Sequence, residues 1–155
     1  MSHKQTDRGG YKSNANTDEK VMMSIVRTAE LFKKKMGAIF KNYGLTFSQY
    51  NVLRILDTST NGMNTITNVS RLMLVSGANM TGVAKRMEKN GFLIRRSDAK
   101  DERITLLEIT PKGRETLKNI HKGKEDHLKE FMISASLNRK EQMLAELKQI
   151  SKSLG

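Results

Sequence analysis

The apolar positions between residues 17 and 44 recur at alternating intervals of three and four. This spacing places a single narrow stripe along one long helix, as in a coiled coil. Thr17 or Asp18 is the expected N-cap, and Gly44 suits the left-handed position that follows a helix. The stripe can pack on its own domain or on a second copy of the chain. Its members are Met22, Ile25, Ala29, Phe32, Met36, Ile39 and Tyr43.

A second helix is predicted to start at a capping box. The side chains of Thr46 and Gln49 can satisfy each other's backbone donors there. The helix runs to about Asp57, and the polar loop 58–62 follows it. Its inward face consists of Tyr50, Leu53 and Leu56.

Two short helices joined by a tight turn follow this loop. The first is expected over about 65–74, and the second begins at the N-cap Ser76 and ends at Asn90-Gly91. The turn Val75-Ser76-Gly77 separates them. The expected inward residues are Ile66, Val69, Leu72 and Met73 in the first helix, and Met80, Val83, Ala84 and Met87 in the second.

The period of the apolar residues then changes from 3.6 to two, which is typical of strands. Two strands are predicted, at Phe92–Arg96 and Arg103–Ile109, and the polar turn 97–102 joins them. They form a β-hairpin with a charged tip. Its inward face carries Thr105, Leu107 and Ile109.

Two C-terminal helices complete the predicted order. Thr110 caps the first of them, with Pro111 at the first helical position, and Asn138 with Glu141 three residues later caps the last. The last helix carries a further apolar seam, in which the apolar residues recur at intervals of four, three and four. The apolar residues are Leu117, Ile120, Leu128, Phe131 and Ala135 in the first helix, and Met143, Leu147, Ile150 and Leu154 in the last.

This order predicts a mainly α fold with a small β-hairpin wing. Residues 45–110 form a winged helix-turn-helix domain, and the segments 17–44 and 111–155 are dimerisation helices on either side of it. Residues 1–16 are polar and are expected to be a disordered lead. The two seams favour a homodimer with contacts at Met22, Ile25, Ala29, Phe32, Met143, Leu147, Ile150 and Leu154.

Composition narrows the function classes. The chain has 155 residues and a formal net charge of +12, which is spread along the sequence and not held in one basic tail. It contains no cysteine, which excludes disulfides, cysteine nucleophiles and thiol redox switching. No apolar run approaches the ~20 residues that cross a bilayer. We therefore expect a cytoplasmic protein without membrane contact.

Catalytic and metal sites have no support in the sequence. It lacks a glycine-rich phosphate loop, a nucleophile elbow and metal-ligand spacing. His121 and Glu125 share a helix face but His127 points away, so three ligands do not converge. Paired carboxylates at Asp98 and Asp101 fit better as partners of nearby cations in a basic hairpin tip, namely Arg95, Arg96, Lys100 or Arg103. We predict no enzyme activity, no metal and no cofactor.

The helix that begins at Ser76 has the surface expected of a DNA recognition helix. Small residues at its N-terminal end let the backbone approach base edges in a major groove. In the hairpin tip, Lys100 and Arg103 can reach a flanking minor groove or the DNA backbone. The predicted DNA contacts on the helix are Ser76, Gly77, Asn79, Thr81, Gly82, Lys85, Arg86 and Lys89.

The stretch from Leu45 to Gly113 resembles the multiple-antibiotic-resistance regulator (MarR) family of bacterial winged-helix repressors. The flanking helices match in place and length, so the resemblance covers about residues 20–153. The matching pieces are Leu45-Thr46-x-x-Gln49-Tyr50-x-Val52-Leu53, Arg86-Met87-Glu88-Lys89-Asn90-Gly91-Phe92-Leu93-Ile94-x-Arg96, Asp98-x-x-Asp101-x-Arg103 and Ile109-Thr110-x-Lys112-Gly113.

This resemblance implies a homodimer that binds a pseudo-palindromic operator through two recognition helices and two wings. It implies that Arg103 enters the minor groove, that Asp101 orients it, and that small aromatic or amphipathic ligands modulate binding. The sequence departs from the family pattern where Ala99 replaces a frequent proline, Glu102 a frequent arginine and Gly82 a larger side chain. The wing tip is therefore less basic than in many members.

These features predict a dimeric, sequence-specific, double-stranded DNA-binding transcriptional regulator that acts as a repressor. Two alternatives stay open: a non-specific basic architectural protein that binds nucleic acid, and a protein-interaction adaptor that retains a winged helix. Aromatic residues make up only 5% of the chain, which disfavours binding of single strands, because stacking needs clustered rings.

Overall fold

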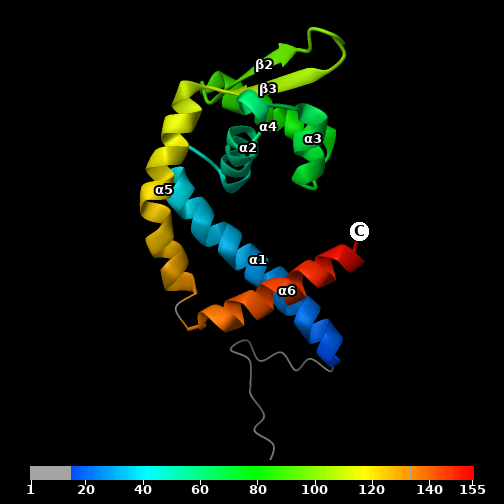
Figure 1. Ribbon diagram of the computed structural model, residues 1–155, viewed down its shortest axis with the longest axis vertical. Helices are drawn as coiled ribbons and strands as arrows, with labels where there is room; N and C mark the ends of the chain where they lie inside the picture. Colours follow the sequence, from blue (N-terminus) through cyan, green and yellow to red (C-terminus); the bar gives the residue numbers. More distant parts are fainter. Residues whose placement is uncertain (1–14, 133) are drawn as a thin grey trace, which may run out of the picture. The chain divides into compact units, whose positions relative to one another are not determined.

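The computed structural model describes residues 15–132 and 134–155, and these residues are mainly helical (Figure 1). Most of the predicted lead, residues 1–14, lies outside the described residues. The chain divides into two compact units, which meet in sequence at Tyr50 and Asn51. Within the described residues, no helix has both the length and the apolar character that a membrane crossing requires.

The first unit consists of the long helix α1 (Thr17–Lys41) and the start of α2 (Phe47–Asp57). The predicted N-cap of α1 was wrong, because Asn16 caps it. The Asn16 side chain accepts the N–H of Glu19 at 2.9 Å, and the Glu19 carboxylate accepts the N–H of Asn16 at 3.1 Å. This reciprocal pair satisfies two backbone donors, so the N-cap lies one residue before Thr17 and the helix begins at Thr17 itself.

The link between α1 and α2 follows the sequence prediction. Gly44 has φ +74, and the N–H of Leu45 donates to the carbonyl of Phe40, which closes the C-terminus of α1. The capping box is present, with Thr46 N–H donating to Gln49 Oε1 at 2.8 Å and Gln49 N–H donating to Thr46 Oγ1 at 3.2 Å. The ring of Phe40 stacks on Tyr50 with centroids 3.9 Å apart.

The apolar seam of α1 has two different parts. Met36 is buried, whereas Met22 and Phe32 remain 42% and 39% exposed in a single copy of the chain. Within one copy only Met36 of the seam is fully buried, although the Phe32 ring also contacts Phe47 with the ring centroids 6.2 Å apart. The rest of the stripe is still available to another surface.

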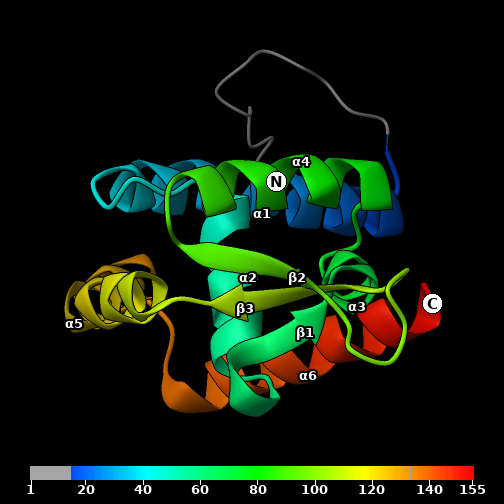
Figure 2. The ribbon, with the colours of Figure 1, turned by 90° about the horizontal axis from the view of Figure 1, so that it is seen from above.

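The second unit contains a three-stranded antiparallel sheet in the order β1-β3-β2, formed by β1 (Met63–Thr65), β2 (Leu93–Ser97) and β3 (Thr105–Ile109) (Figure 2). The predicted hairpin is β2 and β3. The strand β1 was missed, because three residues are too few to show an alternating pattern. It forms since the free edge of β3 offers backbone partners, with Met63 opposite Glu108.

A one-turn 3-10 helix at Thr60–Gly62 precedes β1, and helix α3 (Ile66–Leu72) follows β1 directly. Thr65 caps α3 by accepting the N–H of Asn68 at 3.1 Å. The helix ends two residues earlier than predicted, at Leu72, and a turn follows in which Leu74 has φ +53. The inward placement of Leu72 was therefore wrong, because its side chain in the last turn is 52% exposed.

Helix α4 (Gly77–Lys89) is capped by Ser76, as predicted, with Ser76 Oγ accepting the N–H of Asn79 at 3.3 Å. Its buried residues are Met80, Ala84 and Met87, which share one face. At its other end Gly91 has φ +77, and the N–H of Phe92 donates to the carbonyl of Met87. This turn directs the chain from α4 into β2.

The last two helices are α5 (Pro111–Phe131) and α6 (Leu137–Ser153). The predicted start of α5 is confirmed, since Thr110 Oγ1 accepts the N–H of Gly113 at 3.1 Å. Two predicted details were wrong. Ala135 lies beyond the end of α5, and Ser136 caps α6 in place of Asn138. Ser136 has the extended backbone that an N-cap needs, whereas Asn138 already lies inside the helix.

Candidate nucleic-acid interface

Helix α4 separates an inward apolar face from an outward polar one. Met80, Ala84 and Met87 hold it against the sheet and α3, which positions the opposite face toward solvent. Most of the predicted contact residues are exposed, and Thr81 and Gly82 are half-buried. The exposed ones on this helix and its cap are Ser76, Gly77, Asn79, Lys85, Arg86 and Lys89.

The N-terminal end of α4 offers an open backbone. A side chain added at Gly77 would meet no other atom within 4 Å. The Thr81 hydroxyl donates to the Gly77 carbonyl at 2.9 Å, so its oxygen is left as the group that can accept a hydrogen bond from a base. The exposed N–H groups and the helix dipole both favour an anionic partner at this end.

Gly82, one of the departures from the family pattern, leaves space that Arg86 uses. A Cβ built at Gly82 would lie 3.6 Å from Arg86 Nη1, so the guanidinium lies over the glycine one turn away. A larger side chain at this position would compete with Arg86 for the outward face of α4.

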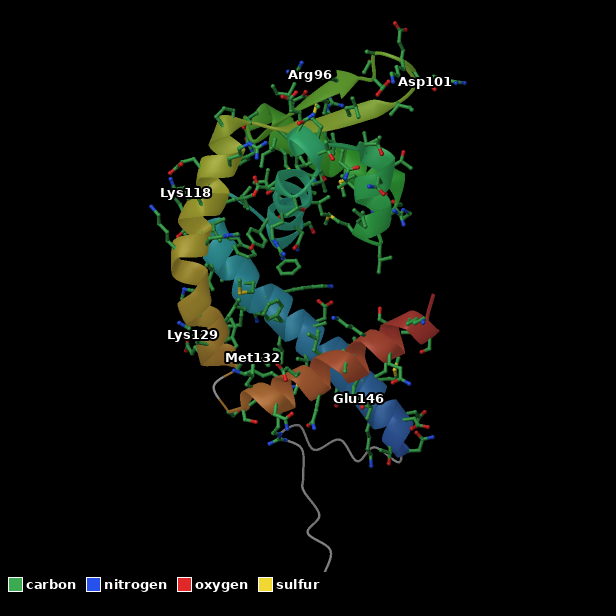
Figure 3. All side chains as sticks on the ribbon, in the orientation of Figure 1. Arg96, Asp101, Lys118, Lys129, Met132 and Glu146 are labelled. Carbon is green, nitrogen blue, oxygen red and sulfur yellow. The ribbon has the colours of Figure 1, made fainter. Side chains whose placement is uncertain are left out.

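The wing tip is organised by two carboxylates. Asp98 Oδ1 accepts the N–H of Lys100 at 2.7 Å and that of Asp101 at 3.2 Å, so Asp98 shapes the turn and does not pair with a cation through any bond that the structure shows. Asp101 Oδ1 accepts Arg103 Nε at 3.0 Å and Asp101 Oδ2 accepts Arg103 Nη2 at 3.0 Å. Figure 3 labels Asp101 at this tip.

The pair at the tip holds an exposed cation in place. The side chain of Arg103 is 90% exposed, although Asp101 binds it through two parallel hydrogen bonds. These hydrogen bonds lower the pKa of Asp101 and raise the pKa of Arg103, so both groups stay charged near neutral pH. The arrangement can present a guanidinium to an anionic groove with little loss of side-chain freedom.

The other arginines of the wing are held by glutamates that the sequence analysis did not consider. Arg95 pairs with Glu88 of α4 at 2.7 Å, and Arg96, labelled in Figure 3, pairs with Glu108 of β3 at 2.7 Å. Of the four cations proposed as partners of Asp98 and Asp101, the structure pairs only Arg103 with either of them. Arg95 and Arg96 are turned toward the body of the wing by partners on α4 and β3.

Lys112 also has a role that the sequence analysis missed. Its Nζ donates to the Asn90 carbonyl at 2.7 Å and lies 4.8 Å from the centre of the Phe92 ring. A cation is favourable there, because the C-terminus of a helix carries unsatisfied carbonyls and partial negative charge. Lys112 therefore stabilises the end of α4, and its spacing in Thr110-x-Lys112-Gly113 was the available signal.

An open hollow of about 460 Å³ lies beside the N-terminal half of α5. Asp57 at the end of α2 accepts a hydrogen bond from Arg114 at 2.8 Å on its wall. The lining combines the cations Arg114, Lys118 and Lys122 with Asp57, Leu117 and His121. Among the described residues no group of three or more potential metal ligands occurs, and the side chain of Glu125 lies outside them.

Comparisons with known proteins find relatives among transcriptional regulators. The model of the family described as transcriptional regulator SarA/Rot matches residues 34–120. The HTH-type regulator YkoM of Bacillus subtilis is 40% identical over 82 residues, which cover 52% of this chain and 51% of YkoM. The chain thus spans about half the length of that relative. The HTH-type regulator SarZ of Staphylococcus saprophyticus is 31% identical over 114 residues, which cover 72% of this chain and 76% of SarZ.

A solved structure shares the fold over most of the chain. It is Sco3205, a MarR-family transcriptional regulator from Streptomyces coelicolor, in complex with DNA. The TM-score is 0.82 at 18% identity, and the match covers 91% of this chain and 94% of Sco3205. The winged-helix fold predicted from the sequence is confirmed, with β1 as an additional strand.

Proposed function

The chain belongs to the SarA/Rot family of transcriptional regulators, and we propose that it is a homodimeric, sequence-specific regulator that represses transcription from a pseudo-palindromic operator. The observation that carries this proposal is the pairing of two DNA-facing elements in one compact unit. The polar face of α4 fits a major groove, and the exposed, preorganised Arg103 fits an adjacent minor groove or backbone.

The first test of the proposal is selectivity. An operator selected from a random duplex library should bind the protein at least 10³-fold more tightly than scrambled DNA of the same length, which is roughly the low end for specific regulators. Fluorescence anisotropy at fixed salt measures both affinities. Equal affinities would overturn the proposal in favour of an architectural protein, and no binding at low salt would favour an adaptor. Lower transcription in vitro from a promoter that overlaps the operator would establish repression.

Lys85→Ala should weaken binding to every duplex by a similar factor. The Lys85 side chain lies on the outward face of α4, where we place a contact with phosphate. Losing one phosphate contact should reduce the slope of log affinity against log salt by roughly one. Anisotropy titrations at several salt concentrations give this slope. Lys148→Ala, on the exposed surface of α6, is the control, and an equal change in both variants would argue against the contact.

We place the dimer contacts on the two seams, and their exposure supports this. None of Met22, Ile25, Ala29, Phe32, Met143, Leu147, Ile150 and Leu154 is buried in a single copy of the chain. Helix α6 has no buried residue along its whole length. Apolar stripes of this extent are stabilised when a second copy removes them from water.

Leu147→Glu should shift the protein from dimer to monomer, because it places a charge in the α6 seam. Operator affinity should fall with it, since a monomer engages one half-site only. Sedimentation velocity reports the mass, and anisotropy reports the binding. Gln149→Glu introduces the same charge off the seam and should leave the dimer intact. A monomeric wild-type protein, or a dimeric Leu147→Glu variant, would contradict the proposed interface.

We also propose that a small aromatic or amphipathic anion modulates DNA binding. The cationic hollow on α5 supports this, because its volume of about 460 Å³ is within the usual size of a ligand site and its wall includes Leu117 beside the cations. Figure 3 labels Lys118, which lies on the wall. A ligand that binds the free protein better than the DNA-bound form would release the operator by shifting the population.

Benzoate is a suitable probe of this site. It should raise the thermal midpoint of the free protein and weaken operator binding, and Lys118→Ala should reduce both effects. Lys148→Ala should retain them. An unchanged thermal midpoint at millimolar benzoate, or equal responses of the two variants, would count against the hollow as a site for aromatic anions.

A further inference from the structure

Among the strands of the described residues, β2 has a partner on one edge only, because the sheet order is β1-β3-β2. On that edge the N–H of Arg95 donates to Glu88 Oε1 at 3.0 Å. The carboxylate of a helix residue thus takes the place of a neighbouring strand at the centre of β2. An edge N–H of this kind would otherwise face water or another chain.

The second oxygen of Glu88 holds the side chain of the same residue. Arg95 Nε and Nη2 each lie 2.7 Å from Glu88 Oε2, and both side chains are about one third exposed. One carboxylate therefore fixes both the backbone and the guanidinium of Arg95. These hydrogen bonds lower the pKa of Glu88, so the carboxylate stays ionised across the neutral range.

The position of Glu88 on α4 allows this contact to affect where the wing tip lies relative to α4. Glu88 lies in the last turn of the proposed recognition helix, and Arg95 lies midway along the strand that leads to the wing tip. Strand β2 continues for two residues beyond Arg95, and the turn that leads to Arg103 follows directly. A change in the angle of β2 at Arg95 would therefore displace the wing tip, and a displacement of about 1 Å is enough to lengthen a hydrogen bond to DNA beyond its usual range.

Electrostatics alone would disfavour an acidic residue here. A carboxylate on a recognition helix repels DNA phosphates, unless a cation neutralises it. Arg95 neutralises it, and because Arg95 pairs with Glu88, its own charge does not contact DNA. The pair therefore adds nothing to the electrostatic attraction for DNA, but it can fix the orientation of the wing against α4.

We propose that Glu88 is a positioning residue for DNA recognition, which fixes the angle of the wing against α4 by holding the edge of β2 at Arg95. It lets α4 and Arg103 engage the same duplex without the wing having to be ordered on binding. The inference rests on the proposed function and adds a residue that acts without touching DNA.

A double-mutant cycle between Glu88→Gln and Arg103→Ala tests this role. In the wild-type background Glu88→Gln should lower operator affinity about tenfold, because the wing is no longer held in register with α4. In the Arg103→Ala background it should lower affinity less than twofold, since the contact that it positions is already absent. Anisotropy titrations on the selected operator give all four affinities.

The outcomes separate the inference from the function on which it rests. Equal losses in both backgrounds, or no loss in either, would overturn the role of Glu88 while leaving the regulator intact. A wild-type protein that does not distinguish operator from scrambled DNA would overturn both. Glu115→Gln removes the same charge from the exposed surface of α5 and should leave operator affinity within twofold.

A second measurement does not involve DNA. In the free wild-type protein, residual dipolar couplings of the wing amides and of the α4 amides should fit one alignment tensor. In Glu88→Gln they should require two, while the amides within α4 still fit one. Arg95→Met, which removes the guanidinium but keeps the backbone N–H, should show an intermediate loss of order. A single tensor for the wing and α4 in Glu88→Gln would overturn the proposal.

Discussion

Arg103→Ala is expected to lower operator affinity by roughly ten- to a hundredfold, the range for a side chain that contacts DNA bases directly. The guanidinium is 90% exposed and Asp101 holds it through two parallel hydrogen bonds, so binding costs little ordering of the side chain. Anisotropy titrations on the operator, and on a version with altered flanking base pairs, measure the loss. The loss should be larger on the original flanks.

Arg103→Lys is the matched control for charge. It keeps the cation but cannot form both hydrogen bonds with Asp101, so it should recover only the part of the affinity that depends on charge. Asp101→Asn should weaken binding less than Arg103→Ala, because the cation remains but loses its orientation. Unchanged affinity in Arg103→Ala would exclude the wing tip from the interface.

The Asp101–Arg103 pair also has a defined pH dependence. Arg103 donates hydrogen bonds that hold the pKa of Asp101 below its ordinary value of 3.8. The stabilisation is therefore fully present above that ordinary value and is lost only as the pH falls through the lowered pKa. Between pH 5 and pH 8 we expect the ratio of wild-type to Asp101→Asn affinities to stay constant, which titrations at each pH will check.

Gly113→Ala is expected to lower the free energy of unfolding by about 3 kcal/mol, because the site has no room for a methyl group. A Cβ there would lie 2.5 Å from the Phe92 carbonyl oxygen, 2.8 Å from Ile109 Cγ1 and 3.3 Å from Leu53 Cδ2. The first of these is backbone and cannot turn away. The first turn of α5 would have to move off the sheet, and urea unfolding measures the cost.

Gly123→Ala in the same helix is the control. A Cβ at Gly123 would meet nothing within 4 Å, so only the helix propensity changes. The substitution should raise the free energy of unfolding by about 0.5–1 kcal/mol. Opposite signs for the two alanines would establish that close packing, and not the flexibility of glycine, keeps Gly113 in place. Equal effects would contradict that explanation.

Elements that depend on neighbours within a few residues were predictable. The Thr46–Gln49 capping box, the Ser76 and Thr110 caps and the left-handed Gly44 and Gly91 involve groups no more than five residues apart, so the residue types suffice to identify them. The apolar faces of α2 and α4 could be predicted from the helical spacing of their apolar residues alone. The N-caps of α1 and α6 were misplaced because several adjacent residues had suitable side chains.

The same distinction between local and long-range interactions applies to the candidate site. The sequence predicts the exposed face of α4 and the charged hairpin tip as the DNA-binding surface, because their residue types and spacing suit that chemistry, and the structure places most of these residues at the surface. The partners of Arg95 and Arg96 were not predicted, since only the packing of α4 on β2 and the register of β2 on β3 bring Glu88 and Glu108 to them, whereas the resemblance already implied the pairing of Asp101 with Arg103. The role of Lys112 at the end of α4 was missed for the same reason.

The sequence by itself determined the order of helices and strands, the caps that start and stop most of them, and the family of regulators to which the chain belongs. Only the tertiary structure decided that β1 joins the sheet, that Leu72 faces solvent, and that Glu88 binds the free edge of β2. The physical reason is the range of the interactions. Caps and periodic faces are local, whereas β1 and the edge of β2 depend on backbone groups that folding alone brings together.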